Sequence, residues 1–192
     1  MNLEVQKKHF EHHIAKFTDY GNIKILDFQK PDSSEYRIRF LFEEDYYRLH
    51  ISGDLGELIA SNFHNMCWDE FDDYVHNPGY FEEKIDTHSR PIYVYDEEKA
   101  RKDLIERLKG VSFIPTFDFE TEEELRDETI DDILSDFDDR RGIGSKGYDA
   151  LSEYDSDCWE YISEIGKEKT GIIELYLLAF DLAKKKLEED GC

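Results

Sequence analysis

The sequence has 192 residues, of which 47 are acidic and 24 are basic, so its net charge near neutral pH is −23. This charge argues against direct binding of nucleic acid, whose phosphates would be repelled, but it permits attraction to a protein with a basic surface. A hydrophobic content of 39% is enough for a folded core. The sequence shows neither an apolar run of the roughly 20 residues that span a membrane nor the apolar core of a signal peptide, so we expect a soluble, cytoplasmic protein.

The first elements expected are a helix and a strand. Residues 3–18 place apolar side chains at helical spacing, and residues 23–28 alternate as in a strand. Three histidines, His9, His12 and His13, fall within the predicted helix, where His9 and His13 would share one face and could hold a metal ion. Because no third ligand is evident, we interpret them as surface or boundary residues and keep a metal site as the alternative.

The stretch 35–61 predicts an antiparallel meander. From Tyr36 the chain alternates aromatic or aliphatic side chains with arginines, which is the pattern of a half-buried strand. An acidic break and then a glycine turn, GDLG, separate two further strands. These three strands are expected at 36–42, 47–51 and 58–60. Together with residues 23–28 they predict a small antiparallel sheet of about four strands, whose apolar face must be covered by helices.

Helical patterns follow the meander. A helix over 63–75 would turn Phe63, Met66 and Phe71 inward. His64 and Cys67 could supply two zinc ligands, but no second pair has a suitable spacing, so burial of Cys67 is the better interpretation. Further segments are expected as a helix at 80–85, an extended stretch at 91–95 and a helix at 96–108.

The most acidic helix of the chain begins near Thr121, after a connector at 111–119. Thr121 and Glu124 have the spacing of a capping box, and a single apolar stripe follows. The stripe consists of Ile130, Ile133, Leu134 and Phe137. Because the stripe must face the core, we expect the surrounding carboxylates to project outward and to contact a partner. The predicted partner-binding residues are Glu124, Glu128, Asp131, Asp132, Asp136, Asp138 and Asp139.

The remaining C-terminal elements are a loop and three helices. The glycine-rich, basic loop at 140–147 does not match a phosphate-binding loop. Helices are expected at 148–154 and at 158–165, with Trp159 in the core. Residues 172–187 are apolar nearly all round, so we predict that they form the buried hub of the C-terminal helical part.

The charge divides unevenly along the chain. Residues 1–110 carry 15 basic and 23 acidic side chains, whereas residues 111–192 carry 9 and 24. From the predicted meander and helices we predict an α+β fold class, and the connector at 111–119 places the boundary between a unit over 1–110 that contains the meander and an acidic, helical part over 111–192. The two parts are expected to pack together as one compact protein.

No catalytic signature is present in the sequence. It contains no nucleophile elbow, dinucleotide fingerprint, HExxH or paired CxxC. Neighbouring carboxylates such as Asp131-Asp132 or Asp138-Asp139 could bind Mg²⁺, but 47 acidic residues produce such pairs by composition alone. We expect a protein that is not an enzyme and needs no cofactor. The alternative is a metal-dependent nuclease or another enzyme that uses the acidic cluster.

Carboxylates on a rigid helix can match the charge density of nucleic acid. Duplex DNA carries one charge per about 1.7 Å of its axis, and a helix that rises about 1.5 Å per residue is comparable when half of its residues are acidic. The expected partner is therefore a basic nucleic-acid-binding protein, which this surface would occupy in competition with its normal ligand. The alternative is a helix face that is only solvated.

Several parts of the sequence resemble small proteins that phages, prophages and plasmids of Firmicutes encode. These parts are YRIRFLF and LHISGDLGE in the meander, YFEEK at 80–84, and the ending 172–187 after DCWEY at 157–161. Type II anti-CRISPR proteins, which inhibit Cas9, come from the same genomic setting. The resemblance implies a phage-type inhibitor in the cytoplasm of a bacterial host, with Cas9 or its guide-RNA complex as the favoured partner. A maintenance factor of a mobile element that acts by ordinary protein contacts is a further alternative.

Overall fold

The computed structural model describes residues 1–114 and 121–189, and the chain divides into two compact units. Unit 1 combines Met1–Ile92 with the stretch that begins at Gly171, and unit 2 is the continuous segment Tyr93–Thr170. Because both helices and antiparallel sheets are present, the α+β class is confirmed. No helix within these described ranges is long and apolar enough to cross a membrane.

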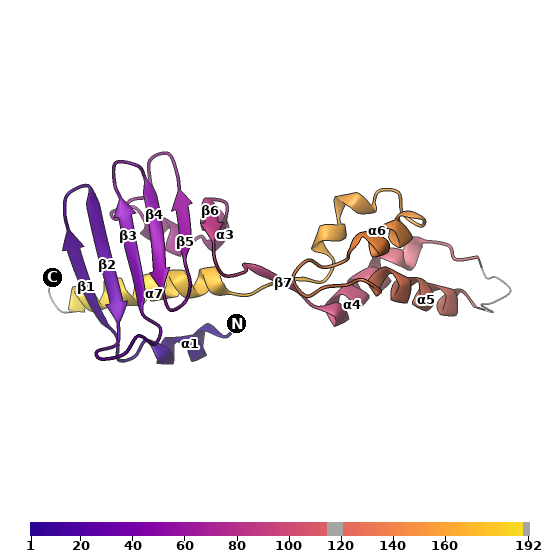
Figure 1. Ribbon diagram of the computed structural model, residues 1–192, viewed down its shortest axis with the longest axis horizontal. Helices are drawn as coiled ribbons and strands as arrows, with labels where there is room; N and C mark the ends of the chain where they lie inside the picture. Colours follow the sequence, from indigo (N-terminus) through magenta and orange to yellow (C-terminus); the bar gives the residue numbers. More distant parts are fainter. Residues whose placement is uncertain (115–120, 190–192) are drawn as a thin grey trace. The chain divides into compact units, whose positions relative to one another are not determined.

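Unit 1 contains a six-stranded sheet in which each strand pairs antiparallel with the next strand along the chain (Figure 1). This sheet is larger than the four strands expected. Strands β2 to β5 correspond to the predicted strands, and β1 and β6 extend the sheet at its two edges. The strands are β1 (Ile14–Asp19), β2 (Ile23–Gln29), β3 (Ile38–Glu43), β4 (Arg48–Gly53), β5 (Leu58–Ser61) and β6 (Ile85–His88).

The N-terminal segment forms a short helix and an edge strand instead of the single helix expected over 3–18. Helix α1 (Leu3–His9) ends before Phe10, and β1 then pairs with β2 along its whole length. Apolar residues such as Ile14 and Phe17 fit helical spacing over so short a span. The backbone hydrogen bonds that β2 offers favour the strand.

The apolar face of the sheet is covered by helices, and the C-terminal helix lies along it (Figure 1). The helices that bury side chains on this face are α2 (Asp72–Val75), α3 (Pro78–Glu82) and α7 (Ile172–Glu189), and α1 packs against α7. In α7, the ring of Phe180 is fully buried, with its centroid 4.7 Å from that of Phe71 and 5.3 Å from that of Phe40. The prediction that this helix is the hub of the C-terminal helical part is therefore wrong, since α7 completes the core of unit 1.

Only the end of the helix expected over 63–75 is helical, and the residues before α2 form turns. Met66 and Phe71 are buried as predicted, but Phe63 is 92% exposed. The side-chain oxygen of Asn62 accepts the Phe63 N–H at 2.9 Å. Such a local side-chain bond to the backbone competes with helix formation, and it accounts for the turn at this point.

Unit 2 is inserted into unit 1 between β6 and α7. Its two ends pair with each other as a ribbon of β7 (Tyr93–Tyr95) and β8 (Lys167–Lys169). The chain therefore divides after residues 92 and 170, whereas we expected one boundary after residue 110. The expected boundary followed the helix stop at Gly110 and the connector after it, but the compact units follow packing. The α-helices of unit 2 are α4 (Glu97–Arg107), α5 (Glu122–Leu134) and α6 (Ser145–Ser152).

A separate apolar core holds unit 2 together. The buried residues of this core are Ala100, Leu104, Leu108, Phe113, Ile130, Ile133, Leu134, Leu151, Cys158 and Ile165. The helix expected over 158–165 consists of two short 3₁₀ turns, η2 (Cys158–Glu160) and η3 (Ile162–Glu164). Trp159 is 63% exposed and not a core residue, because Cys158 takes the buried position of η2. Of the connector expected over 111–119, the part beyond residue 114 lies outside the described residues.

Candidate partner-binding surface

The acidic helix α5 begins at the capping box that the sequence predicts. The Thr121 hydroxyl accepts the backbone N–H of Glu124 at 3.2 Å, and the Glu124 carboxylate accepts the backbone N–H of Thr121 at 3.2 Å. These two bonds satisfy donors that the first turn of a helix leaves without partners. The start of α5 is thereby fixed, and the Glu124 side chain has a structural role at it.

A buried stripe sets the direction in which α5 faces. Ile130 and Ile133 are fully buried, Leu134 is nearly so, and Phe137 beyond the helix end is half-buried. Thr129 is also buried, and its hydroxyl donates to the backbone carbonyl of Leu125 at 2.7 Å. Rotation of the helix would expose these side chains and is therefore opposed by the loss of their burial.

Four of the predicted partner-binding carboxylates lie on the opposite face of α5 and are exposed. They follow one another at i, i+4, i+7 and i+8, which places them in one row on a helix surface. At about 1.5 Å per residue the row extends over about 12 Å. We call these residues the acidic face: Glu124, Glu128, Asp131 and Asp132.

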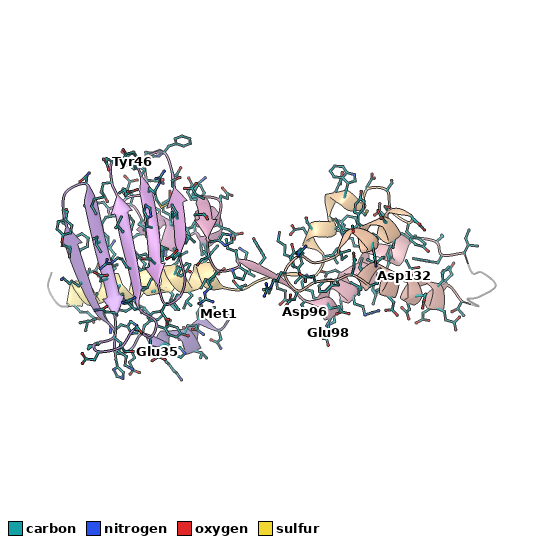
Figure 2. All side chains as sticks on the ribbon, in the orientation of Figure 1. Met1, Glu35, Tyr46, Asp96, Glu98 and Asp132 are labelled. Atoms are coloured by element: carbon teal, nitrogen blue, oxygen red, sulfur yellow. The ribbon has the colours of Figure 1, made fainter. Side chains whose placement is uncertain are left out.

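The members of the acidic face differ in how far they are already paired, and the Glu124 carboxylate is engaged in the capping box. Asp131 accepts a hydrogen bond from the Arg101 guanidinium of α4 at 2.5 Å, and both side chains are largely exposed. Among the described residues, Glu128 and Asp132 have neither a hydrogen bond nor an ion pair through their side chains. Glu128 and Asp132 are therefore the carboxylates that are most available to a partner, and Asp132 is labelled in Figure 2. The neutralising role of Arg101 is not visible in the sequence, because it arises where two helices pack.

Asp136 has a structural role beside this face. Its carboxylate accepts the backbone N–H groups of Lys146 at 2.9 Å and Gly147 at 3.1 Å, at the start of α6. The bond from Lys146, followed by that from Gly147, holds the pKa of Asp136 below its usual range despite partial desolvation. Asp136 therefore joins the end of α5 to the beginning of α6, and unlike the exposed carboxylates of the acidic face it lies beyond the helix and is half-buried.

Asp138 and Asp139 belong to the turn that follows. The Asp138 carboxylate accepts the backbone N–H groups of Arg140 at 2.9 Å and Arg141 at 3.1 Å, and its backbone pairs with Gly142. The side chains of Asp138 and Asp139 are exposed, but they lie beyond the end of α5. The structure thus does not bring the seven predicted residues together as one row.

The histidines and cysteine considered as metal ligands are dispersed in unit 1. Because α1 ends at His9, the predicted common helical face of His9 and His13 does not exist. His9 stacks on the ring of Tyr36 with 4.4 Å between centroids, while His13 is buried. His12 and His64 are exposed, and Cys67 is a buried free thiol whose pKa is raised by desolvation. Within the part of the chain that the structure describes, no three His, Cys, Asp or Glu side chains are grouped to hold a metal ion.

Unit 2 carries most of the excess negative charge. Residues 93–170 contain 24 acidic and 11 basic side chains, a net charge of −13 on the smaller of the two units.

Comparison with models of known families, with curated proteins and with solved structures returned no match. The chemistry of the acidic face is therefore the basis on which a function is proposed.

Proposed function

We propose that this protein is a stoichiometric, non-catalytic inhibitor that binds a basic, nucleic-acid-binding host protein through the acidic face of α5. The observation that carries the proposal is the row of four outward carboxylates, whose direction is set by the buried stripe on the other side of the helix. A row of this kind attracts a basic surface and repels nucleic acid. Its target would lose access to its own ligand by competition.

The spacing of the carboxylates supports a match to a nucleic-acid strand. Four charges over about 12 Å give an average separation of about 4 Å along the helix axis. Phosphates follow one another at about 3.4 Å along one strand of duplex DNA. The net charge of −13 on unit 2 adds long-range attraction toward the same kind of partner, and this attraction weakens as salt rises.

We favour a host defence nuclease, and Cas9 in particular, as the target. The reason is the resemblance of the meander and of the C-terminal segment to proteins of phages and plasmids, which is the setting of anti-CRISPR proteins. Cas9 holds its heteroduplex in a positively charged channel, which is a surface of the required chemistry. An enzyme or a maintenance factor has no comparable observation in its favour.

The test compares two charge-reversed variants in binding to a Cas9–guide RNA complex. Glu128→Lys/Asp132→Lys changes the two unpaired members of the acidic face. Asp149→Lys/Glu153→Lys is the matched control, because it reverses two exposed carboxylates of the same unit on α6 and just beyond it. We expect the first variant to associate about tenfold more slowly or worse at low salt, and the control to change little.

The same experiment separates an incorrect surface from an incorrect target. If wild type and both variants bind Cas9 equally well, the acidic face is only a solvated surface. If the wild type does not bind, Cas9 is not the target. Inhibition of cleavage should be complete near one inhibitor per Cas9, and inactivation of many Cas9 molecules by one protein would replace this proposal with an enzymatic function.

A further inference from the structure

Unit 1 gathers its exposed aromatic side chains at one end of the sheet. Among its described residues, every Phe, Tyr or Trp that is at least 36% exposed lies at this end. We call this group the aromatic rim: Tyr20, Tyr46, Tyr47, Phe63 and Tyr80. Phe63 is 92% exposed, Tyr46 69% and Tyr20 67%. Figure 2 shows Tyr46 projecting beyond the turn that joins β3 to β4.

The strand register brings these residues together. The β1–β2 turn, the β3–β4 turn and the end of β5 all lie at the same end of the sheet (Figure 1). Backbone hydrogen bonds join the three segments. The N–H of Glu44 donates to the carbonyl of Asn22 at 2.8 Å, and the N–H of Asn62 donates to the carbonyl of Tyr47 at 3.1 Å. The rim is thus one continuous edge whose segments are held together by backbone hydrogen bonds.

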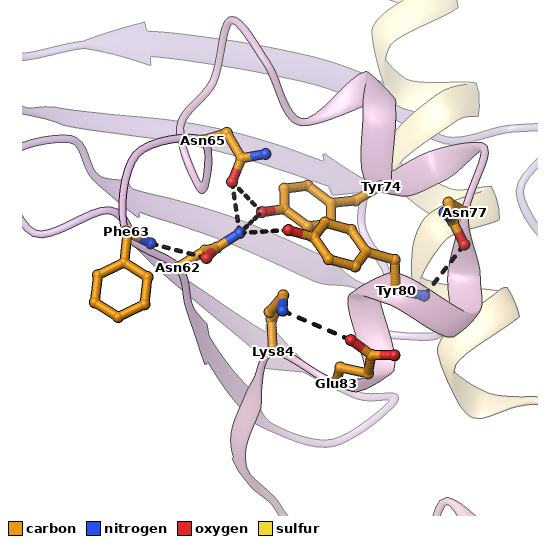
Figure 3. A network of polar contacts seen from close by, with 8 residues as sticks. All are labelled: Asn62, Phe63, Asn65, Tyr74, Asn77, Tyr80, Glu83 and Lys84. Atoms are coloured by element: carbon orange, nitrogen blue, oxygen red, sulfur yellow. Dashed lines mark hydrogen bonds and ion pairs between the residues drawn. The ribbon is translucent and has the colours of Figure 1, made fainter.

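A polar network supports the rim at Phe63 (Figure 3). The side-chain nitrogen of Asn62 lies 2.6 Å from the side-chain oxygen of Asn65, 2.6 Å from the Tyr74 hydroxyl and 3.2 Å from the Tyr80 hydroxyl. The Tyr74 and Tyr80 rings are stacked with 5.5 Å between centroids. The backbone beneath the exposed Phe63 ring is therefore fixed before any partner binds, which lowers the entropy lost on binding.

The charges around the rim indicate the chemistry of the partner. Asp45, Asp69 and Glu70 are exposed carboxylates on the rim or beside it. Lys24 is paired with Glu44 at 3.3 Å and with Asp69 at 3.7 Å, and Arg48 is paired with Glu43 at 3.9 Å. Among the described residues, Asp45 and Glu70 are therefore the carboxylates of this group that no ion pair engages. Exposed aromatic faces next to carboxylates fit a guanidinium group, which stacks on a ring and donates to an acid. Phosphates would be repelled by the same carboxylates.

The rim already contains one cation on an aromatic face. The ammonium nitrogen of Lys84 lies 4.3 Å from the centroid of the Tyr80 ring. Rigid tyrosine and phenylalanine side chains are also typical anchors of protein interfaces. We propose that the aromatic rim is a second docking surface, which receives arginine side chains of a protein partner. This proposal does not depend on the acidic face of α5.

The experiment titrates the full chain with a nine-residue peptide of alternating arginine and glycine, and with its lysine counterpart. The protein used is the Glu128→Lys/Asp132→Lys variant, so that α5 contributes little to peptide binding. Backbone amide NMR maps the contact, and calorimetry measures the affinity. We expect shifts at the rim and an affinity for the arginine peptide about two- to fivefold higher than for the lysine peptide, as exposed cation–π contacts provide.

Two aromatic variants give the decisive comparison. Tyr46→Ala/Phe63→Ala should remove the preference for arginine, and both side chains are exposed enough to leave the melting temperature nearly unchanged. Trp159→Ala is the control, because it removes an exposed aromatic ring from unit 2. Equal affinities for the two peptides, shifts outside the rim, or an unchanged preference in the double variant would each overturn the proposal. If the Glu128→Lys/Asp132→Lys variant loses Cas9 binding, that result bears on the acidic face and does not contradict the proposal for the aromatic rim.

Discussion

Gly147 of α6 lies against the backbone carbonyl of Ile133 in α5 with no room for a side chain between them. A Cβ atom on Gly147 would stand 2.0 Å from that oxygen and 2.5 Å from a methyl group of Ile143. The close approach of α5 and α6 therefore requires glycine at this position. Since Ile133 is part of the buried stripe, this contact also helps to set the direction of the acidic face.

Gly147→Ala should destabilise unit 2 by about 1–3 kcal/mol, since the clash is with backbone and exceeds the gain in helix propensity of about 1 kcal/mol. Thermal unfolding followed by circular dichroism measures the effect. Gly110→Ala is the control, because a Cβ there would meet no atom within 4 Å. A Gly147→Ala protein as stable as wild type would show that α6 can move away from α5 without loss.

Burial of His13 should make the stability of unit 1 depend on pH. Its Nε2 lies 3.2 Å from the Tyr36 carbonyl oxygen and donates to it, and its buried Nδ1 has no hydrogen-bond partner among the described residues. Desolvation, opposed by the bond to Tyr36 and aided by the charges of Lys186 and Lys30, lowers the pKa of His13. The folded state therefore favours the neutral ring.

Because the unfolded chain binds a proton near the ordinary histidine pKa of about 6.5 and the folded chain does not, stability should fall as the pH drops below about 6.5. The loss should continue until the pH passes below the lowered pKa of the folded state. Melting temperatures between about pH 7.5 and pH 5 measure it. His13→Gln keeps a donor for Tyr36 and should flatten this dependence, whereas His12→Gln, at an exposed position, should not.

The sequence predicts local elements better than the packing that joins them. The meander is confirmed because each of its strands carries its own alternation and lies next to its partner in the chain. The capping box at Thr121 and the burial of Ile133 are local patterns as well. Segment 14–19 fits two periodicities, and only the presence of β2 favours the strand.

Contacts between elements that are far apart in the chain could not be predicted from local patterns. Whether a carboxylate is free or already bonded depends on residues of other elements. Arg101 on α4 donates to Asp131, and the backbone at the start of α6 donates to Asp136. The place of α7 in unit 1 depends on an insertion that no residue pattern marks. A helix stop at Gly110 and a proline-containing connector are poor indicators of a boundary that is set by apolar contacts.

Removal of unit 2 should leave unit 1 able to fold. In the antiparallel β7–β8 ribbon, Tyr93 and Lys169 are cross-strand partners, so their Cα atoms lie about 5 Å apart and a short linker can join Ile92 to Gly171. The deletion of 93–170 with a Gly-Ser linker should keep the near-ultraviolet signal of the packed aromatic core and unfold cooperatively. A chain that ends at residue 110 lacks α7 and should not fold, so the pair of deletions tests the boundaries seen in the structure against the one expected after residue 110.

The position of α7 also determines the order in which the protein can assemble during synthesis. The sheet leaves the ribosome before unit 2, but Phe180 and the other apolar residues of α7 that complete its core are made after unit 2. All of unit 2 emerges in between as one continuous segment, so it can fold while the sheet still has an uncovered apolar face. The inserted unit is therefore free to fold first, and the emergence of α7 is the event that completes the core of unit 1.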